Sequence, residues 1–161
     1  MRLPALCLAL LCALPALAAE REVVPGPGML AEAIAGAAPG DVLILQDGAY
    51  AGPVTIDRPL TIRGPETAAV EGGGNGTVIT ISAPDVVLEG FTVSGSGSRN
   101  EDLDAGVKIL KGADRVRVEG LSLIDNMHGI DVHGGRDAQI IGNRITGRQN
   151  LHMNERGNGI Y

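Results

Sequence analysis

The sequence has almost no aromatic side chains: it contains no tryptophan, one phenylalanine and two tyrosines in 161 residues. A core built on stacked rings is therefore excluded, and few rings are available to stack on sugars. Aliphatic side chains must build any core. Glycine, at 24 residues, is far above its ordinary share, which favours short strands and frequent turns.

Cysteine is absent beyond the first 18 residues, because Cys7 and Cys12 both lie near the start of the chain. There Arg2 precedes an apolar run from Leu3 to Leu14, and a small-x-small pattern (ALA) ends at Ala18. This arrangement is typical of a secretory signal peptide cleaved near Ala18. The run is too short for a membrane anchor, which needs roughly 20 apolar residues. The exported chain would then have neither disulfides nor thiolate ligands.

Positive charge is also scarce. Removing residues 1–18 takes away only Arg2 among the charged side chains, which leaves 12 basic against 19 acidic residues and a net charge of −7. Nucleic acid is therefore excluded as a partner, and no membrane span is expected. The remaining 143 residues suffice for one hydrophobic core.

An internal repeat organises what remains. Two kinds of segment recur. In the first kind, a central glycine separates two short runs in which inward and outward residues alternate. The second kind begins with a glycine, continues with a short strand-like run, and follows the first kind along the chain. The first kind occupies residues 86–93, 116–123 and 138–145, with a partial copy at 60–64; the second occupies 76–79, 106–109, 129–132 and 159–161. Such self-similarity is the signature of a solenoid.

The spacing of the repeat selects the kind of solenoid. The central glycines of the first segments are 26, 30 and 22 residues apart, so each coil takes about two dozen residues. No six-residue period is present, and no room is left for crossover helices. We expect an all-β fold, a right-handed parallel β-helix of the pectin-lyase-like type, as one domain over residues 19–161.

Alternation along the strands sorts the side chains into faces. Leu88, Val118 and Ile140 should stack in one inward column, and Val107, Ile130 and Ile160 in another. Lys108 and Asp131 face outward one coil apart, as a surface charge pair worth roughly 0.2–1 kcal/mol. Asn143 falls in an inward column, so its amide should hydrogen-bond to neighbouring turns.

The two ends of the repeat differ. Residues 29–37 have apolar side chains at helical spacing between proline and glycine breakers, which predicts an N-terminal capping helix. At the other end the sequence stops at Ile160-Tyr161 inside a strand pattern. We therefore expect a protein truncated at its C-terminus, which associates through its bare last coil.

One corner of the solenoid alternates between long and short turns. The distances between the glycines that flank it are 12, 16, 9 and 17 residues. Residues 94–104 and 146–158 should therefore project as two walls, with the short turn 124–128 as the floor between them. Two coil spacings would hold the walls about 10 Å apart.

The predicted cleft contains candidate metal ligands. Met127 and His128 lie on the floor, and His152 and Met153 lie on the second wall. Thioether and imidazole donors without thiolate suit Cu(I). The alternative is that both methionines pack at the corner of the core and both histidines are solvated. His133, on an outward position, is expected to be a surface residue.

The first wall offers a second chemistry. It contains Arg99, Glu101, Asp102 and Asp104. Asp102 and Asp104 could act as acid and base in glycoside cleavage, or bind Ca²⁺ in a lyase. The alternative is an acidic loop that is merely soluble, and the scarcity of aromatic rings favours it.

Several stretches resemble one family. They are residues 39–42 (PGDV), 59–64 (PLTIRG), 83–90 (APDVVLEG) and above all 153–160 (MNERGNGI). Together with the signal peptide they are similar to the N-terminal half of NosD, the periplasmic maturation protein of nitrous-oxide reductase. The resemblance runs across the exported chain and stops where that family continues with further coils.

The resemblance implies a function in denitrification. It implies a periplasmic β-helix without catalysis of its own, docked on the membrane and ATPase subunits of an ABC transporter. Such a protein would receive copper from a copper chaperone for assembly of nitrous-oxide reductase. Asn154, Glu155 and Arg156 would then shape the wall or meet a partner, because an arginine has no lone pair for a metal. A carbohydrate-binding or carbohydrate-cleaving β-helix remains the alternative.

Overall fold

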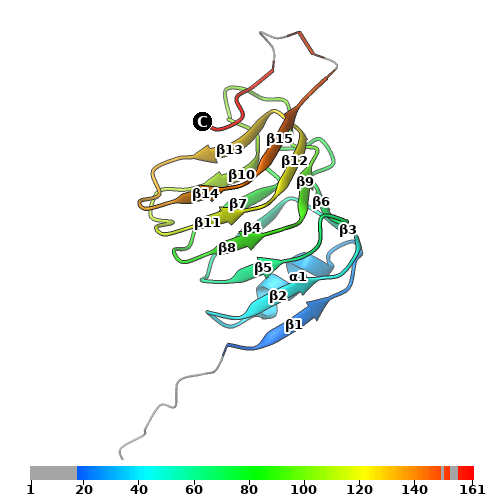
Figure 1. The fold of residues 1–161 in the computed structure, drawn as a ribbon, viewed down its shortest axis with the longest axis vertical. Coiled ribbons are helices and arrows are strands. Elements are labelled where there is room, and N and C mark those ends of the chain that lie inside the picture. The colour runs from blue at the N-terminus through cyan, green and yellow to red at the C-terminus, as the bar shows by residue number, and fades with distance from the viewer. Residues whose placement is uncertain (1–17, 150, 153–155) are drawn as a thin grey trace, which may run out of the picture.

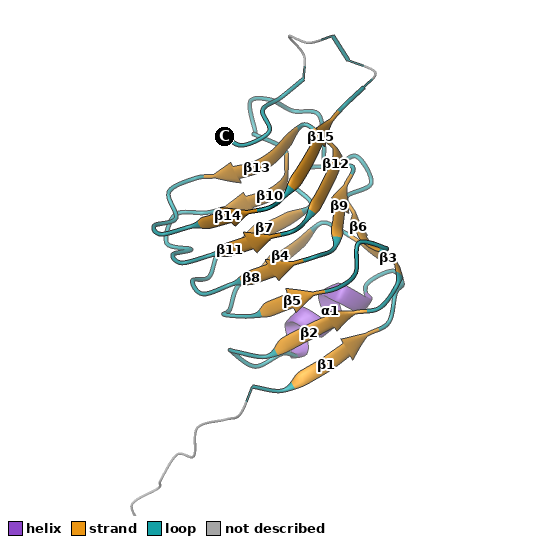
Figure 2. Ribbon diagram, viewed as in Figure 1, coloured by secondary structure: helices purple, strands orange, loops and turns teal. Residues whose placement is uncertain are grey.

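The chain winds through successive coils of short parallel strands, and each complete coil contributes one strand to each of three sheets (Figures 1 and 2). The computed structural model describes residues 18–149, 151–152 and 156–161. The first sheet runs in the order β1 (Glu20–Val23), β2 (Val42–Leu45), β5 (Thr61–Arg63), β8 (Val87–Glu89), β11 (Arg117–Glu119) and β14 (Gln139–Ile141).

The other two sheets complete each coil. The second consists of β3 (Gly48–Ala51), β6 (Ala68–Glu71), β9 (Thr92–Ser94), β12 (Ser122–Asn126) and β15 (Arg144–Gly147). The third consists of β4 (Val54–Ile56), β7 (Ile79–Ile81), β10 (Ala105–Ile109) and β13 (His128–Val132). The pairing between neighbours is parallel throughout, so the parallel β-helix predicted from the repeat is confirmed.

The predicted register is also confirmed. Val118 pairs with Leu88 on one side and Ile140 on the other. Ile130 pairs with Val107 and forms a single bridge to Ile160. The repeat did not reveal β1 or the first complete coil, because those segments lack the central glycine that marks the later copies.

The central glycine of the repeat is required for steric reasons, as Gly90 shows. Its φ is +87°, a value that side chains other than glycine's rarely adopt. A Cβ built there would lie 2.5 Å from the carbonyl oxygen of Gly64, one coil below. The turn between the first and second sheets therefore needs glycine both for its backbone angle and for the close stacking of the coils.

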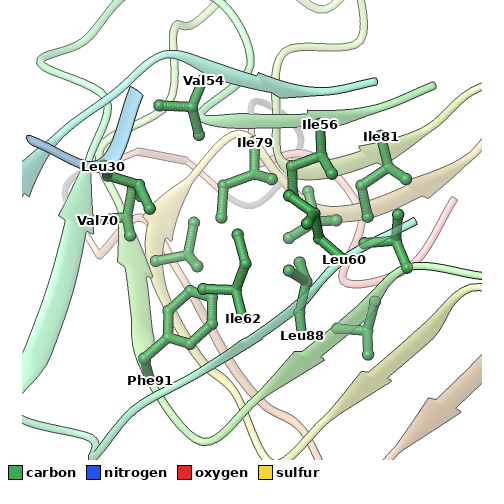
Figure 3. Close-up of a cluster of buried hydrophobic side chains, with 14 of the residues drawn as sticks. Leu30, Val54, Ile56, Leu60, Ile62, Val70, Ile79, Ile81, Leu88 and Phe91 are labelled. Atoms are coloured by element: carbon green, nitrogen blue, oxygen red, sulfur yellow. The ribbon is translucent and has the colours of Figure 1, made fainter. Parts of the chain in front are cut away.

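The core is a column of aliphatic side chains enclosed by the three sheets (Figure 3). Ile62 and Leu88 from one sheet meet Ile79 and Ile81 from another, and all are at most 1% exposed. Phe91, the single phenylalanine, is fully buried with them. Burial of this kind stabilises the fold by about 1.5–3 kcal/mol for each large apolar side chain.

The predicted capping helix is present as α1 (Met29–Gly36), one residue shorter than expected. Its buried side chains are Leu30 and Ile34, and it contacts β3 and β4. Because β4 is the first strand of the third sheet, the helix stands where a further strand of that sheet would otherwise pair. Within the described residues no helix is long and apolar enough to cross a membrane.

The expected role of Asn143 is confirmed. Its Oδ1 accepts a hydrogen bond from Leu121 N at 2.9 Å, and its Nδ2 donates to Val118 O at 2.9 Å. The side chain therefore satisfies backbone groups of the coil below, which is how a half-buried amide is tolerated in an apolar column.

The outward pair Lys108 and Asp131 needs a correction. The two residues are register partners as predicted, with Lys108 Nζ 3.6 Å from Asp131 Oδ2. Asp131, however, is fully buried and neither carboxylate oxygen has a hydrogen-bond partner among the described residues. Lys108 also donates to Asp102 O at 2.6 Å, so the first wall folds back over this part of the sheet. The alternation of residues along a strand does not predict how loops pack. Here the first wall covers the pair Lys108 and Asp131, which was expected on the surface.

Candidate functional site

The corner between the second and third sheets has the alternation of turns that the sequence predicts. Residues 95–104 separate β9 from β10, Met127 alone separates β12 from β13, and residues 148–158 follow β15. The described parts of the two long loops and the short turn border an open cavity of about 900 Å³. Its lining comprises Ser98, Asn100, Glu101, Leu103, Met127, His128, Arg148, Leu151, Arg156, Gly157, Asn158 and Tyr161. The expectation that equivalent bends lie over one another is therefore confirmed.

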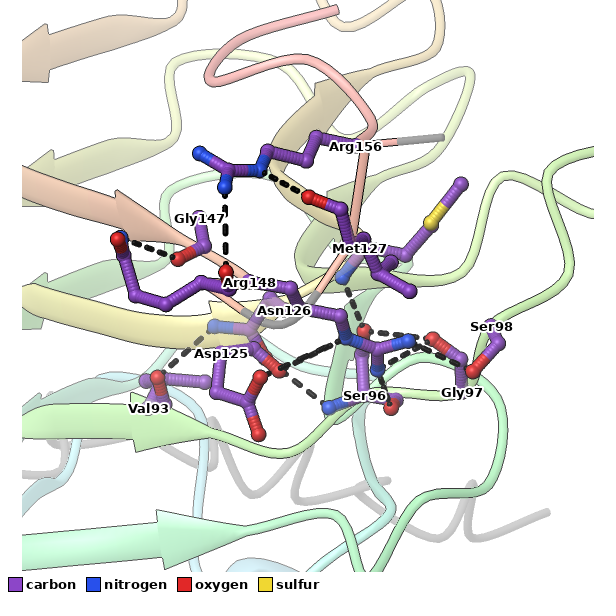
Figure 4. Close-up of polar contacts among 12 residues, drawn as sticks. Val93, Ser96, Gly97, Ser98, Asp125, Asn126, Met127, Gly147, Arg148 and Arg156 are labelled. Carbon is purple, nitrogen blue, oxygen red and sulfur yellow. Dashed lines mark hydrogen bonds and ion pairs between the residues drawn. The ribbon is translucent and has the colours of Figure 1, made fainter. Parts of the chain in front are cut away.

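Arg148 ties the base of the second wall to the first (Figure 4). Its guanidinium donates to Ser96 O at 2.5 Å, Gly97 O at 3.0 Å and Ser98 Oγ at 2.6 Å. It also lies 3.7 Å from Asp125 Oδ1, and only 12% of its side chain is exposed. Because its N–H groups donate to acceptors in the loops, Arg148 holds the two walls together and is not a free cation in the cavity.

His128 joins the two walls at the floor. Its Nδ1 accepts a hydrogen bond from Asn158 N at 3.1 Å, and its Nε2 lies 3.1 Å from Asn100 Oδ1. Because a backbone N–H can only donate, Nδ1 must be the acceptor, and in the neutral ring Nε2 carries the proton. Burial lowers the pKa of His128, against a smaller opposing effect of the nearby Asp131 carboxylate. His128 is 2% exposed, and the acceptor role of Nδ1 in this geometry is that of a neutral ring.

The segment after the second wall adds a short parallel edge to β13. Gly129 N donates to Asn158 O at 3.0 Å, and Tyr161 N donates to Ile130 O at 2.9 Å. The ring of Tyr161 lies over His128 with 5.7 Å between centroids. His128 therefore contacts both ends of this segment.

The acidic residues of the first wall serve mainly the loop itself. Asp104 is 4% exposed, and its Oδ2 accepts from Arg99 N at 2.9 Å. Asp102 forms an ion pair of 2.5 Å with Arg99. None of these three residues lines the cavity, whereas Glu101 does, as does Arg156 from the other wall. Of the predicted wall residues that the structure describes, Glu101 and Arg156 therefore line the cavity, whereas Arg99, Asp102 and Asp104 do not.

The four candidate metal ligands are only partly brought together. Met127 and His128 line the cavity, and Met127 is 8% exposed. His152 is exposed and does not contribute to the lining. Met153 lies outside the described residues, as do Asn154 and Glu155. In the part of the chain that the structure describes, no cluster of three or more His, Cys, Asp or Glu side chains is placed to hold a metal ion. His133 is exposed, as expected.

Eight lining residues were not among the candidates from the sequence: Ser98, Asn100, Leu103, Arg148, Leu151, Gly157, Asn158 and Tyr161. The asparagines have the composition of ordinary turns, and nothing in the sequence identifies which loop arginine folds inward. For all of them except Tyr161, which follows the second turn, the position within the two long turns was the available signal.

The fold defines the class of the protein, the right-handed parallel β-helices. The PL6 family alginate lyase AlyGC has this fold, with a TM-score of 0.56 and 24% identity over 74% of this chain and 18% of its own. A substitution variant of the same lyase gives a TM-score of 0.62 and 23% identity over 77% of this chain and 19% of its own. At these identities the likeness concerns the fold alone.

The particular relatives are NosD proteins. Over 117 residues, 73% of the chain, it is 38% identical to the "Probable ABC transporter binding protein NosD" of Stutzerimonas stutzeri and 34% identical to the protein of that name from Pseudomonas aeruginosa. The chain spans 27% of the length of each of these relatives. No protein-family model matches it. The resemblance to NosD is thereby confirmed over this region.

Proposed function

We propose that this chain is part of a periplasmic accessory protein that works with an ABC transporter and handles copper for the maturation of nitrous-oxide reductase. The observation that carries the proposal is the 117-residue match to two proteins named as ABC transporter binding proteins NosD. The N-terminal sequence supports it, because residues 1–18 have the charged, apolar and small-residue regions of an export signal. On this proposal the ABC transporter subunits, a copper chaperone and the reductase are the partners.

The corner cavity is the proposed place for copper, which would be cargo rather than a resident cofactor. Met127 and His128 are adjacent on its floor, and thioether with imidazole is a donor set that suits Cu(I). His152 and Met153 belong to the neighbouring wall by sequence and complete the proposed set. The fit is conditional in two respects. His152 lies outside the lining and must move to reach the ion, and both nitrogens of His128 already have hydrogen-bond partners, so an ion must displace one of them.

Cu(I) uptake by the purified protein tests the site. We expect that replacing His128 and His152 together (His128→Ala with His152→Ala) weakens Cu(I) binding at least about tenfold, because two of the proposed donors are lost. Competition against a chromogenic Cu(I) chelator measures the affinity. His133→Ala is the matched control, since His133 is an exposed histidine outside the cavity.

Two results would contradict the proposal. Unchanged Cu(I) affinity in the double variant would remove the site. Release of unsaturated or reducing ends from polyuronides by the wild-type protein would instead favour the carbohydrate-cleaving alternative. Asp102 and Asp104 would be the residues to replace in that case, and their engagement within the loop argues against such activity.

A further inference from the structure

The last described segment of the chain depends on His128. Residues 158–161 pair with β13 through backbone hydrogen bonds that include Gly129 N to Asn158 O at 3.0 Å and Val132 N to Tyr161 O at 2.9 Å. The first N–H of this segment, that of Asn158, donates to His128 Nδ1 instead of to a carbonyl. A side-chain lone pair thus takes the place of a backbone acceptor at the point where the segment joins the sheet.

A glycine makes this docking sterically feasible. A Cβ at Gly157 would overlap the carbonyl oxygen of Met127 and lie 3.0 Å from His128 Cε1. At Gly159, two residues further on, a Cβ would meet nothing within 4 Å. A side chain is therefore excluded at Gly157 but has space at Gly159, whose carbonyl oxygen accepts a hydrogen bond from Ile130 N at 3.0 Å.

We propose that a soft cation coordinated by His128 and the docking of residues 157–161 on β13 exclude each other. The inference rests on the proposed copper function. Nδ1 has one lone pair in the ring plane, and it cannot serve both a metal ion and the Asn158 N–H. When the ion takes that lone pair, the proton stays on Nε2 and the hydrogen bond to Asn100 is kept. Asn158 loses its acceptor, and the segment is released at that end.

Release of residues 157–161 would therefore be an observable sign that a cation occupies the site at His128. The segment that must move also carries Tyr161, whose ring lies against His128, so the change extends along β13. Because only the undocked state binds the cation, a variant that weakens docking raises the apparent cation affinity in proportion to the growth of the undocked population.

The pair Gly157→Ala and Gly159→Ala tests the exclusion with Cu(I) as the probe. We expect Gly157→Ala to raise the Cu(I) affinity at least about threefold, because the undocked, binding-competent population grows. Gly159→Ala should leave the affinity as in the wild type. In the wild-type protein, saturating Cu(I) should lower the hydrogen-exchange protection of the Asn158 amide about tenfold or more. Cu(I) is diamagnetic, so NMR follows that amide directly.

The outcomes separate this inference from the proposed function. Stoichiometric Cu(I) binding with an unchanged Asn158 amide, or with equal affinity in both glycine variants, overturns the exclusion and leaves the copper function standing. Absence of Cu(I) binding in the wild type and in Gly157→Ala overturns both.

Discussion

At the scale of single residues, buried amides hold the coils in register. Asn126 is 4% exposed; its Oδ1 accepts from Ser96 N at 3.1 Å and its Nδ2 donates to Val93 O at 3.0 Å. Asn143 makes the equivalent pair of bonds at another corner. Each amide supplies one donor and one acceptor to a backbone that has turned out of its ladder, so that few buried polar groups are left unpaired.

Replacing Asn126 should therefore destabilise the protein. We expect Asn126→Ala to lower the free energy of unfolding by about 1–3 kcal/mol, because Ser96 N and Val93 O lose their partners inside the molecule. Chemical denaturation followed by circular dichroism measures it. Asn75→Ala, at an exposed turn, serves as the control and should change stability little. Equal stability of the two variants would mean that water reaches the Asn126 site.

At the scale of elements, α1 protects the first edge of the third sheet. The helix is short, at eight residues, and in isolation such a helix is unstable in water. Its stability comes from Leu30 and Ile34, which are buried against the end of the solenoid. The helix and the edge therefore stabilise one another, since each covers what the other would expose.

A charge on the buried face of α1 should break this association. We expect Leu30→Asp to lower the free energy of unfolding by about 2–5 kcal/mol and to promote self-association, because an apolar end and an unpaired strand edge become exposed. Light scattering at increasing protein concentration detects the association. Ala31→Asp adds the same charge on the exposed side of the helix, and its stability and self-association should match those of the wild type. An unchanged Leu30→Asp protein would show that the edge needs no cover.

At the scale of the whole molecule, ion pairs link successive coils at the corner between the third and first sheets. Arg115 binds both carboxylate oxygens of Asp85, at 2.7 and 2.6 Å. Arg136 binds Asp114 in the next coil, at 3.0 and 2.5 Å. The pKa values of Asp85 and Asp114 are lowered, chiefly by these side-chain hydrogen bonds from arginine.

The lowered pKa values predict acid sensitivity. A carboxylate whose pKa is lower in the folded protein than its ordinary 3.8 contributes stability that is present above that pH and lost as the pH falls through the folded value. We expect the melting temperature to fall on acidification from about pH 5 to about pH 2, and to fall less in a double variant, Asp85→Asn with Asp114→Asn. Scanning calorimetry across this range measures both.

Asp137→Asn provides the control for that experiment. Asp137 occupies the corner position equivalent to that of Asp85, with φ values of +57° and +56°, and has no ion pair among the residues that the structure describes. Its replacement should leave the acid response as in the wild type. A double variant with the full wild-type response would assign the sensitivity to other carboxylates.

Also at this scale, the sequence predicted the solenoid, its inward columns and the corner that forms the cavity. These follow from periodicity, because a repeat of fixed order stacks equivalent positions regardless of the loops between them. The first coil was not visible in this way, since β2, β3 and β4 share hydrophobic alternation with the repeat but not its glycine.

By itself, the sequence determined which residues stack: Val118 over Leu88, Ile130 over Val107, and the turn at Met127 between two long loops. The tertiary structure alone decided what the loops do. In the folded protein, Asp131 is covered by a loop and Arg148 links the two walls through hydrogen bonds. Both ring nitrogens of His128 have hydrogen-bond partners, and His152 is exposed. The physical reason is that strand positions obey a period of two, whereas loop side chains are placed by individual contacts that no period encodes.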